Sequence, residues 1–385
     1  MITVALVGTG NISRFHIEAY CAFPERCKIV ALCDISEKCM EVKERYNLTE
    51  AEVFYSHTAM LSAMNGRIDL VDICTPPFCH AHIAIDCLNA GCNVVVEKPM
   101  AASLEECDAM LDAEKQSGKM LACIAQNRFR DQFAALKKAV DSGLIGRVLH
   151  VQVDSLWWRG LSYYDLWWRG TWKSEGGGCT LNHAVHHIDM LIWMLGMPEK
   201  VTAVLANTAH NNAEVEDISV AILQYPQGTL AQITSSVVHH GEEQQIIFQG
   251  EKARVSVPWK VHASVAAPNG FPKQEHDESL ERKLNEFVNV APMPYTVHKG
   301  ELENILTALE QKIPPFITGA DGRNTLELIS AIYKSGASSA TVKLPLGKDD
   351  PFYTVKGIMA AVPHFYEKSA SLADFSGEIT TGRNL

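Results

Sequence analysis

The sequence predicts an α/β Rossmann domain followed by an α+β domain with a large open antiparallel sheet. Three observations predict it: strand and helix patterns alternate in the first third, a glycine-rich turn follows the first strand, and short strand-like runs dominate the second half. The chain has 385 residues, and at about 100–200 residues per domain this length favours two domains. We place the boundary at residue 125, which gives domains 1–125 and 126–385.

The first domain is expected to contain parallel strands separated by helices. Five short apolar runs are the expected strands, at residues 3–7, 28–33, 70–74, 93–96 and 120–125. Four helical patterns lie between them, at residues 12–22, 38–46, 81–90 and 104–117. Strands separated by helices of this length indicate βαβ units in a parallel sheet.

The second domain shows a different pattern. A helix is expected at 133–142, a strand at 148–155 and a helix at 181–195. Five strand-like runs then follow between residues 201 and 257, with turn signals such as 226–228 between them. Neighbouring strands joined by short turns form an antiparallel sheet. Two further helices are expected at 299–312 and 323–335.

Composition excludes several classes of function. Lys and Arg number 34 against 45 Asp and Glu, a net charge of −11. An acidic surface argues against binding to nucleic acid or to anionic membranes.

No apolar stretch approaches the roughly 18 residues that suggest a membrane span, and the beginning MITVALVGTG resembles a strand rather than a signal peptide. Eleven cysteines without a CxxC pair indicate buried thiols in a reducing compartment, so we expect a cytoplasmic protein.

A dinucleotide-binding turn is expected directly after the first strand. The pattern is G-x-G-x-x-S, with Ser13 in the place of the third glycine. The first glycine permits a tight turn, and the second lets the backbone approach a pyrophosphate at the helix N-terminus. An ordinary strand–helix turn is the alternative. The residues expected at the cofactor are Gly8, Thr9, Gly10, Asn11 and Ile12.

The second strand ends at Asp34, which indicates the choice of cofactor. A carboxylate here can accept the ribose hydroxyls of adenosine, and it repels a 2′-phosphate. Neither Ile35 nor Ser36 supplies a cation for that phosphate. We therefore predict NAD rather than NADP, with Asp34 and Ile35 at the cofactor. The alternative is that Asp34 caps the next helix.

Three further stretches carry a resemblance to a known family. They are TPPFCH at 75–80, EKPM at 97–100 and GGGCTLNHAVHHID at 176–189. Together they resemble the Gfo/Idh/MocA oxidoreductases, the family of glucose–fructose oxidoreductase and inositol dehydrogenase. Residues 298–304 and 316–323 are similar to that family's C-terminal helices, and the resemblance runs in order from residue 2 to about 345.

The resemblance implies an NAD-binding first domain and a second domain for substrate binding and oligomerisation. It implies a sugar, glycoside or cyclitol as the small-molecule substrate and a homodimer or homotetramer formed through the open sheet. Its catalytic residues would be Lys98 and His186, with Asn182 where many members have Asp. Cofactor contacts are expected at Thr75, Pro76, His80, Glu97, Lys98, Asn127, Trp168 and Arg169. Substrate contacts are expected at Lys98, Arg128, Trp157, Tyr164, Asn182, His183, His186 and His298.

The chemistry of these residues suits hydride transfer from a secondary alcohol. Lys98 follows the end of a strand, where ligands bind in open α/β sheets, and its ammonium can stabilise a developing alkoxide. His186 is suited to accept the hydroxyl proton near neutral pH. Asn182 precedes it by four residues, which predicts that both lie on one helix face. A lone helical histidine in the core is the alternative for His186.

Two other features allow more than one interpretation. Residues 157–172 contain five of the seven tryptophans; their rings suit sugar CH surfaces, and Arg suits carboxylate or phosphate oxygens. A loop buried in a subunit interface is the alternative.

The histidines at 183, 186 and 187 also permit a metal site. No HExxH pattern or ordered acidic ligand accompanies them, and we expect no metal.

The leading functional hypothesis is an NAD-dependent sugar or cyclitol dehydrogenase acting on one ring hydroxyl, with C3 as the candidate position. The first alternative is an NAD-dependent glycoside hydrolase that oxidises C3 transiently, eliminates the aglycone and reduces the product again. The second is a non-catalytic NAD-binding regulator. The presence of both Lys98 and His186 argues against the second.

Overall fold

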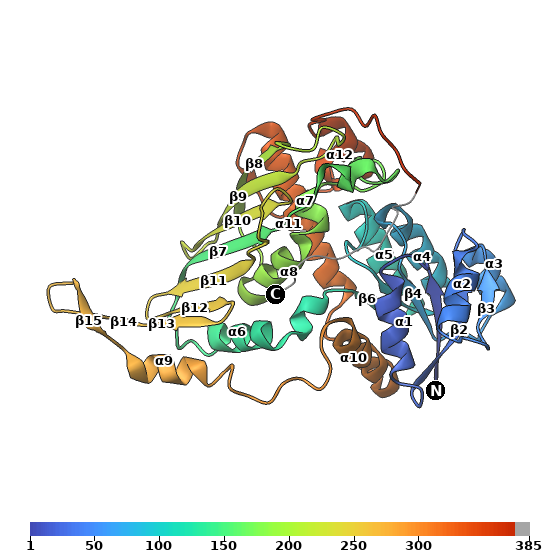
Figure 1. Cartoon of the computed structure of the whole chain (residues 1–385), viewed down its shortest axis with the longest axis horizontal. Coiled ribbons are helices and arrows are strands. Elements are labelled where there is room, and N and C mark those ends of the chain that lie inside the picture. The colour runs from blue at the N-terminus through green and yellow to red at the C-terminus, as the bar shows by residue number, and fades with distance from the viewer. Residues whose placement is uncertain (374–385) are drawn as a thin grey trace. The chain divides into compact units, whose positions relative to one another are not determined.

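The computed structural model describes residues 1–373 (Figure 1). The chain divides into two compact units, each of which is described by itself. The first unit comprises Met1–Phe129, Pro294–Leu326 and Tyr353–Val355. The second comprises Arg130–Met293, Glu327–Phe352 and the described chain from Lys356. Each unit is therefore assembled from segments that are distant in the sequence.

The first unit is built on a six-stranded sheet in which every pair of neighbouring strands is parallel, as the sequence predicts. The strand order is β3-β2-β1-β4-β5-β6, so the direction of winding reverses between β1 and β4. Ligands bind at such a point, beyond the carboxyl ends of the strands. The strands are β1 (Ile2–Val7), β2 (Cys27–Cys33), β3 (Glu52–Phe54), β4 (Leu70–Ile73), β5 (Asn93–Val96) and β6 (Leu121–Cys123).

Five of the helices in this unit, α10 among them, confirm predicted ones, whereas α3 and the short edge strand β3 were not predicted. Helix α10 comes from late in the chain and packs against α1, where Leu302, Ile305 and Leu306 share a buried cluster with Ile17 and Tyr20. Burial of these apolar surfaces joins the late segment to the first sheet. The helices are α1 (Ser13–Cys21), α2 (Lys38–Arg45), α3 (His57–Ala63), α4 (His80–Asn89), α5 (Leu104–Ser117) and α10 (Val297–Gln311).

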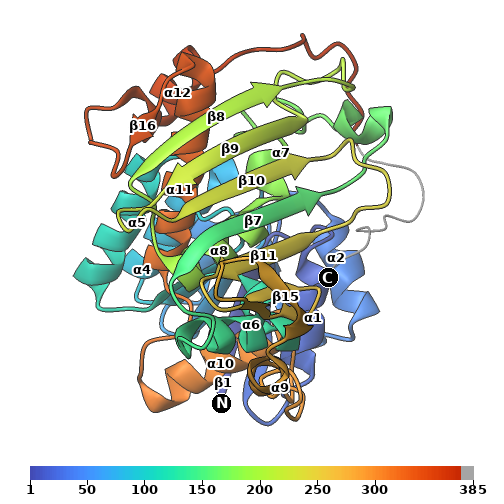
Figure 2. The same ribbon diagram turned by 90° about the vertical axis from the view of Figure 1, so that its left-hand side faces the viewer.

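The second unit contains an eight-stranded sheet of order β13-β12-β11-β7-β10-β9-β8-β16, most of which is visible in Figure 2. The predicted antiparallel pairing holds except between β7 and β10, which are parallel. A parallel pair needs a long crossover, and residues 157–229 supply it. The strands are β7 (Val148–Leu156), β8 (Lys200–Ala206), β9 (Ile218–Gln224), β10 (Leu230–Ser236), β11 (Gln245–Gly250), β12 (Arg254–Val257), β13 (Lys260–His262) and β16 (Val342–Lys343).

Helices cover one face of this sheet and leave the other open. Helix α6 (Asp131–Asp141) packs on β12, α7 (Cys179–Asn182) on β9 and β10, and α8 (Val185–Leu195) on β7. Along β9, buried and exposed side chains alternate, because successive residues of a strand point to opposite faces. The open face carries exposed apolar side chains at Val204, Val220, Ile222 and Leu230.

Several details of the second half differ from the prediction. The helix predicted at 181–195 is two helices, since α7 ends at Asn182 and α8 begins at Val185. The predicted helix at 323–335 lies within the longer α11 (Gly319–Ser338). Six strands and α-helices were not predicted: β13, β16, the hairpin of β14 (Ser264–Ala266) and β15 (Pro272–His276), α9 (Glu278–Asn285) and α12 (Val355–Ala361).

Two properties of the whole described chain bear on the sequence analysis. All eleven cysteines are free, and nine of them are buried, which agrees with their interpretation as small core side chains. No helix within residues 1–373 is long and apolar enough to cross a membrane.

Candidate active site

The glycine-rich turn between β1 and α1 combines a tight contact with an open space. Gly8 has φ +95°, and a Cβ there would lie 2.7 Å from the carbonyl carbon of Cys74 at the end of β4. A Cβ on Gly10 would meet nothing within 4 Å, so the space beside its backbone is open. The buried Ser13 donates its hydroxyl to the Gly10 carbonyl at 2.7 Å. A small polar residue is therefore accommodated at the third glycine position.

Asp34 lies beside this turn and holds it. Its Oδ2 accepts hydrogen bonds from the Thr9 amide at 2.7 Å and the Thr9 hydroxyl at 2.9 Å. Its Oδ1 accepts from the Ser36 amide at 2.9 Å. The residue that precedes α2 is Glu37, so Asp34 is not the cap of that helix. Ile35 is 94% exposed.

The turn after β4 supplies a second part of the same edge. Thr75 Oγ1 is buried and has no hydrogen-bond partner among the described residues. Behind it, the ring nitrogens of the buried His80 lie 2.7 Å from the Thr75 carbonyl and 2.9 Å from the Pro99 carbonyl. Burial lowers the pKa of His80, so the neutral ring can donate to one of these carbonyls at a time. His80 thus joins the turns after β4 and β5.

These features fit a dinucleotide. The open space at Gly10 and the N-terminus of the nine-residue α1 suit a pyrophosphate. The Asp34 carboxylate suits ribose hydroxyls, and the orphaned Thr75 hydroxyl offers a further polar contact. Of the other predicted cofactor residues in this turn, Asn11 is exposed and Ile12 is half-buried.

Asp34 is expected to determine cofactor preference. Asp34→Asn removes the charge but keeps an oxygen that can accept from Thr9, so it should relax discrimination against NADP while NAD binding weakens only modestly. Asp34→Ala should weaken NAD binding further, because the turn also loses its hydrogen bonds. Dissociation constants for both cofactors, measured by fluorescence titration, test this. A wild-type preference for NADP would contradict it.

Lys98 lies on a turn whose backbone is held by a buried carboxylate. It follows β5 by two residues and is half-buried. Its amide donates to Glu97 Oε2 at 3.0 Å. The other oxygen of Glu97 lies 3.0 Å from His16 Nε2 and 3.6 Å from His298 Nε2. The carboxylate at position 97 is thus engaged on both oxygens within the protein.

His298, predicted to contact substrate, is 8% exposed and lies against this carboxylate. Its ring stacks on that of Phe15, with 5.3 Å between centroids. Burial lowers the pKa of His298 even though Glu97 opposes the shift. The lowered pKa favours the neutral form of the ring.

The short helix after β6, Gln126–Phe129, carries two predicted residues, Asn127 and Arg128. Arg128 is only 3% exposed, and its Nη1 lies 3.0 Å from Asp321 Oδ1. Burial alone would raise the pKa of Asp321, but Arg128 and Thr318 hold it below the ordinary value. The guanidinium charge therefore has a counter-charge in the same unit.

In the second unit, the triple glycine is required by close packing. A Cβ on Gly177 would lie 2.2 Å from the Tyr333 hydroxyl, and a Cβ on Gly178 would lie 1.9 Å from the Glu216 carbonyl oxygen. The buried Glu216 carboxylate accepts from the amides of Gly178 and Thr180, and from the Tyr333 hydroxyl, each at 3.0 Å. Sequence reasoning missed Glu216, because nothing local shows that an acid 38 residues after Gly178 holds this turn.

Gly178→Ala is expected to destabilise the protein by about 1–3 kcal/mol or more, the usual cost of overpacking, because the contact is with backbone that cannot rotate away. Gly160→Ala is the matched control, since a Cβ there would meet only Trp158 at an ordinary 3.7 Å. Denaturant unfolding of both variants measures the difference. Equal unfolding midpoints would contradict the packing argument.

Asn182 and His186 lie on either side of a helix break. The Asn182 amide nitrogen donates to the carbonyls of Gly177 at 2.9 Å and Gly178 at 3.2 Å. The prediction that Asn182 and His186 lie on one continuous helix is wrong, because α7 ends at Asn182. Asn side chains compete for nearby backbone groups in this way. His186 is half-buried in the first turn of α8. Lys98 belongs to the first unit and these residues to the second.

A polar chain connects four residues near the triple glycine. Glu175 Oε1 lies 3.0 Å from Arg169 Nη1, which also bonds the Tyr163 hydroxyl. That hydroxyl lies 3.4 Å from His183 Nε2. Burial raises the pKa of Glu175 to about 7, although Arg169 opposes the shift. The guanidinium of Arg169 also lies 4.3 Å from the centre of the Trp168 ring.

Sequence reasoning missed Tyr163 and Glu175, although the tryptophan-rich segment and the triple glycine next to them were the available signals. Perturbed buried acids of this kind concentrate at functional sites. Two of the predicted residues, Arg169 and His183, therefore have specific polar partners within the second unit.

Three other residues of this region are buried. Trp157 donates Nε1 to Ser155 Oγ at 3.1 Å. The Tyr164 hydroxyl and both ring nitrogens of His187 have no hydrogen-bond partner among the described residues. Burial lowers the pKa of His187 to about 4, and Arg130 adds to this shift. His187 is thus a neutral histidine of the core.

Groups of possible metal ligands occur elsewhere. Within the described chain, three groups bring His, Cys or carboxylate atoms within 4.8 Å of one another, and the histidines at 183, 186 and 187 do not form one. The groups are His16, Asp72 and Cys74; His16, Glu97 and His298; and His262, His276 and Glu281.

Comparison with known proteins agrees with this architecture. Residues 2–124 match the model described as "Oxidoreductase family, NAD-binding Rossmann fold", and residues 133–256 match the GFO/IDH/MocA C-terminal domain.

Relatives match over most of their length. The D-glucoside 3-dehydrogenase of Escherichia coli is 24% identical over 89% of this chain and 97% of its own. The myo-inositol 2-dehydrogenase of Thermotoga maritima is 26% identical over 89% and 98%. The WlbA dehydrogenase from Bordetella pertussis, solved with NADH and UDP-GlcNAcA, superposes with a TM-score of 0.75 at 30% identity, over 90% of this chain and 99% of that one. The fold, the glycine turn and these matches together show that the chain is an NAD-binding oxidoreductase of the GFO/IDH/MocA family.

Proposed function

We propose that the protein transfers hydride between NAD and a secondary hydroxyl of a sugar, glycoside or cyclitol. The observation that carries the proposal is Lys98, held on a rigid turn beyond β5 at the cofactor-binding edge of the sheet. The relatives named as glucoside and inositol dehydrogenases support the substrate class. The name of the first of these supports C3 as the ring position.

Each proposed role follows from the chemistry of the side chain. NAD, when bound, accepts or returns the hydride. Lys98 would donate a hydrogen bond to the substrate oxygen and stabilise its developing charge. His186 would take the hydroxyl proton. Asn182 would act as a positioning residue, because its amide holds the glycine carbonyls that precede α7.

The substrate is expected to contact the aromatic and polar residues of the second unit. Trp157 and Tyr164 supply rings that suit sugar CH surfaces. The His183 ring has Tyr163 as its partner. Trp168 and Arg169 are proposed at the cofactor, and Arg169 is oriented by Glu175. Ordered side chains of this kind reduce the entropy lost on binding.

A screen of free sugars, cyclitols, glycosides and nucleotide sugars tests the proposal. Absorbance at the nicotinamide band would report NADH formation, and mass analysis would identify the oxidised product. Aglycone release without net NADH formation would indicate the glycoside hydrolase instead. NAD binding without turnover of any compound would indicate the non-catalytic regulator.

Three further proposals concern organisation and location. We propose residues 1–125 as the NAD-binding domain and 126–385 as the substrate-binding and oligomerisation domain. We propose that a homodimer or homotetramer forms through the open sheet, since Val204, Val220, Ile222 and Leu230 are exposed there, and burial of such a surface favours association. The free cysteines support a cytoplasmic location.

A further inference from the structure

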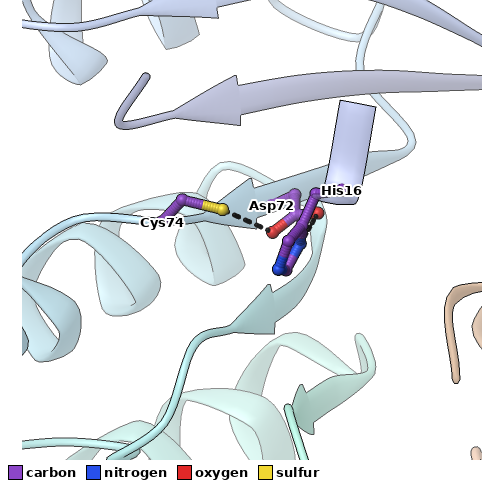
Figure 3. Close-up of side chains that lie close together, drawn as sticks. All are labelled: His16, Asp72 and Cys74. Atoms are coloured by element: carbon purple, nitrogen blue, oxygen red, sulfur yellow. Dashed lines mark hydrogen bonds and ion pairs between the residues drawn. The ribbon is translucent and has the colours of Figure 1, made fainter. Parts of the chain in front are cut away.

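A buried polar network lies under the turn that carries Lys98. His16, on α1, has Nδ1 2.8 Å from Asp72 Oδ2 and Nε2 3.0 Å from Glu97 Oε1. His16 and Asp72 are fully buried, and Glu97 is 4% exposed. Figure 3 shows the His16 ring beside Asp72, with the Cys74 thiol 3.5 Å from the other oxygen of that carboxylate. We call His16, Asp72 and Glu97 the buried triad.

The arrangement requires a charged imidazole. A neutral ring has one N–H, so one of its nitrogens would present a lone pair to a carboxylate. Burial by itself would lower the pKa of His16, but the Asp72 carboxylate outweighs it, and the pKa is raised well above the ordinary value. Burial likewise would raise the pKa of Glu97, but the hydrogen bond from His16 and the nearby ring of His298 hold it well below the usual range.

Tyr20, Cys74 and His298 also lie at the triad, but they carry no positive charge. Tyr20, on α1, donates its hydroxyl to Asp72 Oδ2 at 2.8 Å. Burial raises the pKa of the Cys74 thiol to about 12, and His298 is neutral. Lys98 adjoins Glu97 along the chain. The imidazolium of His16 therefore contacts two buried carboxylates, which would be costly without a partner.

The triad is complete across the neutral range. Because the pKa of His16 is raised, the stability that its charged ring gives to the folded protein is fully present below the ordinary imidazole pKa. This stability is lost as the pH rises through the raised pKa. Because the pKa of Glu97 is lowered, the stability that its carboxylate gives to the folded protein is present above the ordinary carboxyl pKa. This stability is lost as the pH falls through the lowered pKa. Neither loss is expected near neutral pH.

The triad connects the cofactor helix with the turn of Lys98. His16 lies in the first turns of α1, directly after the glycine-rich turn. Glu97 accepts from His16 with one oxygen and from the Lys98 amide with the other. Two hydrogen bonds therefore separate the helix that would face the pyrophosphate from the backbone of the proposed catalytic lysine.

We propose that His16 is a positioning residue. Its imidazolium holds Glu97, and through Glu97 the backbone of Lys98, in a fixed position relative to α1. This inference rests on the proposed role of Lys98. A displacement of about 1 Å at a reacting group can cost as much as 10²-fold in rate. The role is distinct from that of Asp34, which holds the glycine turn from the other side of β1.

The test compares His16→Gln with Tyr20→Phe. Gln is neutral and has both N–H donors on one nitrogen, so it does not reproduce the two separate contacts of the imidazolium nitrogens. We expect kcat to fall about 10- to 100-fold, whereas the NADH dissociation constant should change only a few-fold. Tyr20→Phe removes a hydrogen bond to Asp72 from the same helix without touching Glu97. It should lower the thermal midpoint and leave kcat near the wild-type value. Equal kcat losses in the two variants would overturn the proposal.

A double-variant experiment shows whether the effect passes through Lys98. His16→Gln combined with Lys98→Met should have the single-turnover rate of Lys98→Met alone, yet keep the lower thermal midpoint of His16→Gln. Independent losses that multiply would overturn the proposal. If Lys98→Met itself retains turnover, the proposed function fails instead. Should His16→Gln not fold, Glu97→Gln takes its place, with the same expected results.

Metal analysis of the purified protein completes the test. The atoms of His16, Glu97 and His298 lie within 4.8 Å of one another, so a metal could in principle bridge them. We expect substoichiometric metal by mass spectrometry. One equivalent of metal that is retained in wild type and lost in His16→Gln would overturn the proposed imidazolium bridge.

Discussion

Lys98→Met is expected to lower kcat by about 10²–10³-fold, the usual loss when one donor to a developing oxyanion is removed. The methionine side chain is similar in length but supplies no hydrogen bond and no charge. NAD should still bind, because the glycine turn, Asp34 and Thr75 are unchanged. Steady-state kinetics with a substrate from the screen and an NADH titration measure the two effects separately.

Lys348→Met is the matched control for this substitution. Lys348 is exposed and lies in the second unit, so the same chemical change there should leave kcat unaltered. Turnover of Lys98→Met within a few-fold of wild type would show that Lys98 has no catalytic role. Loss of NADH binding together with kcat would mean that the lysine serves the cofactor rather than the substrate.

His186→Ala is expected to lower kcat by about 10²–10⁴-fold, the typical contribution of a positioned acid or base. In the wild type, kcat should fall at acidic pH as the imidazole takes up a proton and can no longer act as a base. The variant should lack this acidic limb. The pH–rate profiles of both proteins check the expectation, and an unchanged limb in His186→Ala would assign the base to another group.

Asn182→Asp distinguishes positioning from a charge relay. The carboxylate would face the Gly177 and Gly178 carbonyls, to which the native amide donates, so the unfolding midpoint should fall. If Asn182 acts by holding this turn, the acidic limb should remain where it is. A carboxylate in contact with His186 would instead stabilise the imidazolium and move the limb to higher pH.

Patterns local in the chain predicted much of the fold. The alternation of apolar runs and helical segments predicted the parallel sheet, because strand and helix periods are properties of neighbouring residues. The G-x-G-x-x-S turn could be placed for the same reason. Elements with few residues, such as the three-residue β3, have too weak a period to be predicted.

The predicted fold was wrong where the course of the chain depends on contacts with residues that are distant in the sequence. The direction of β7 relative to β10 depends on where a long crossover ends, and no residue in either strand records it. The break between α7, which ends at Asn182, and α8, which begins at Val185, interrupts a continuous helical pattern that gave no sign of it. The sequence also did not show that Arg128 lies against Asp321 and His298 against Glu97; their proposed contacts with substrate stay predictions.

The sequence by itself determined the two-domain class, the cofactor turn and the identity of the residues that could transfer a proton or stabilise an oxyanion, because backbone conformation and side-chain chemistry are local. Only the tertiary structure decided which of those residues hold one another in place. His16 lies 56 residues from Asp72 and 81 from Glu97, and the nearby Asp72 carboxylate raises its pKa although burial opposes the shift. A pKa of that kind arises from three segments packed together, so it cannot be read from any one of them.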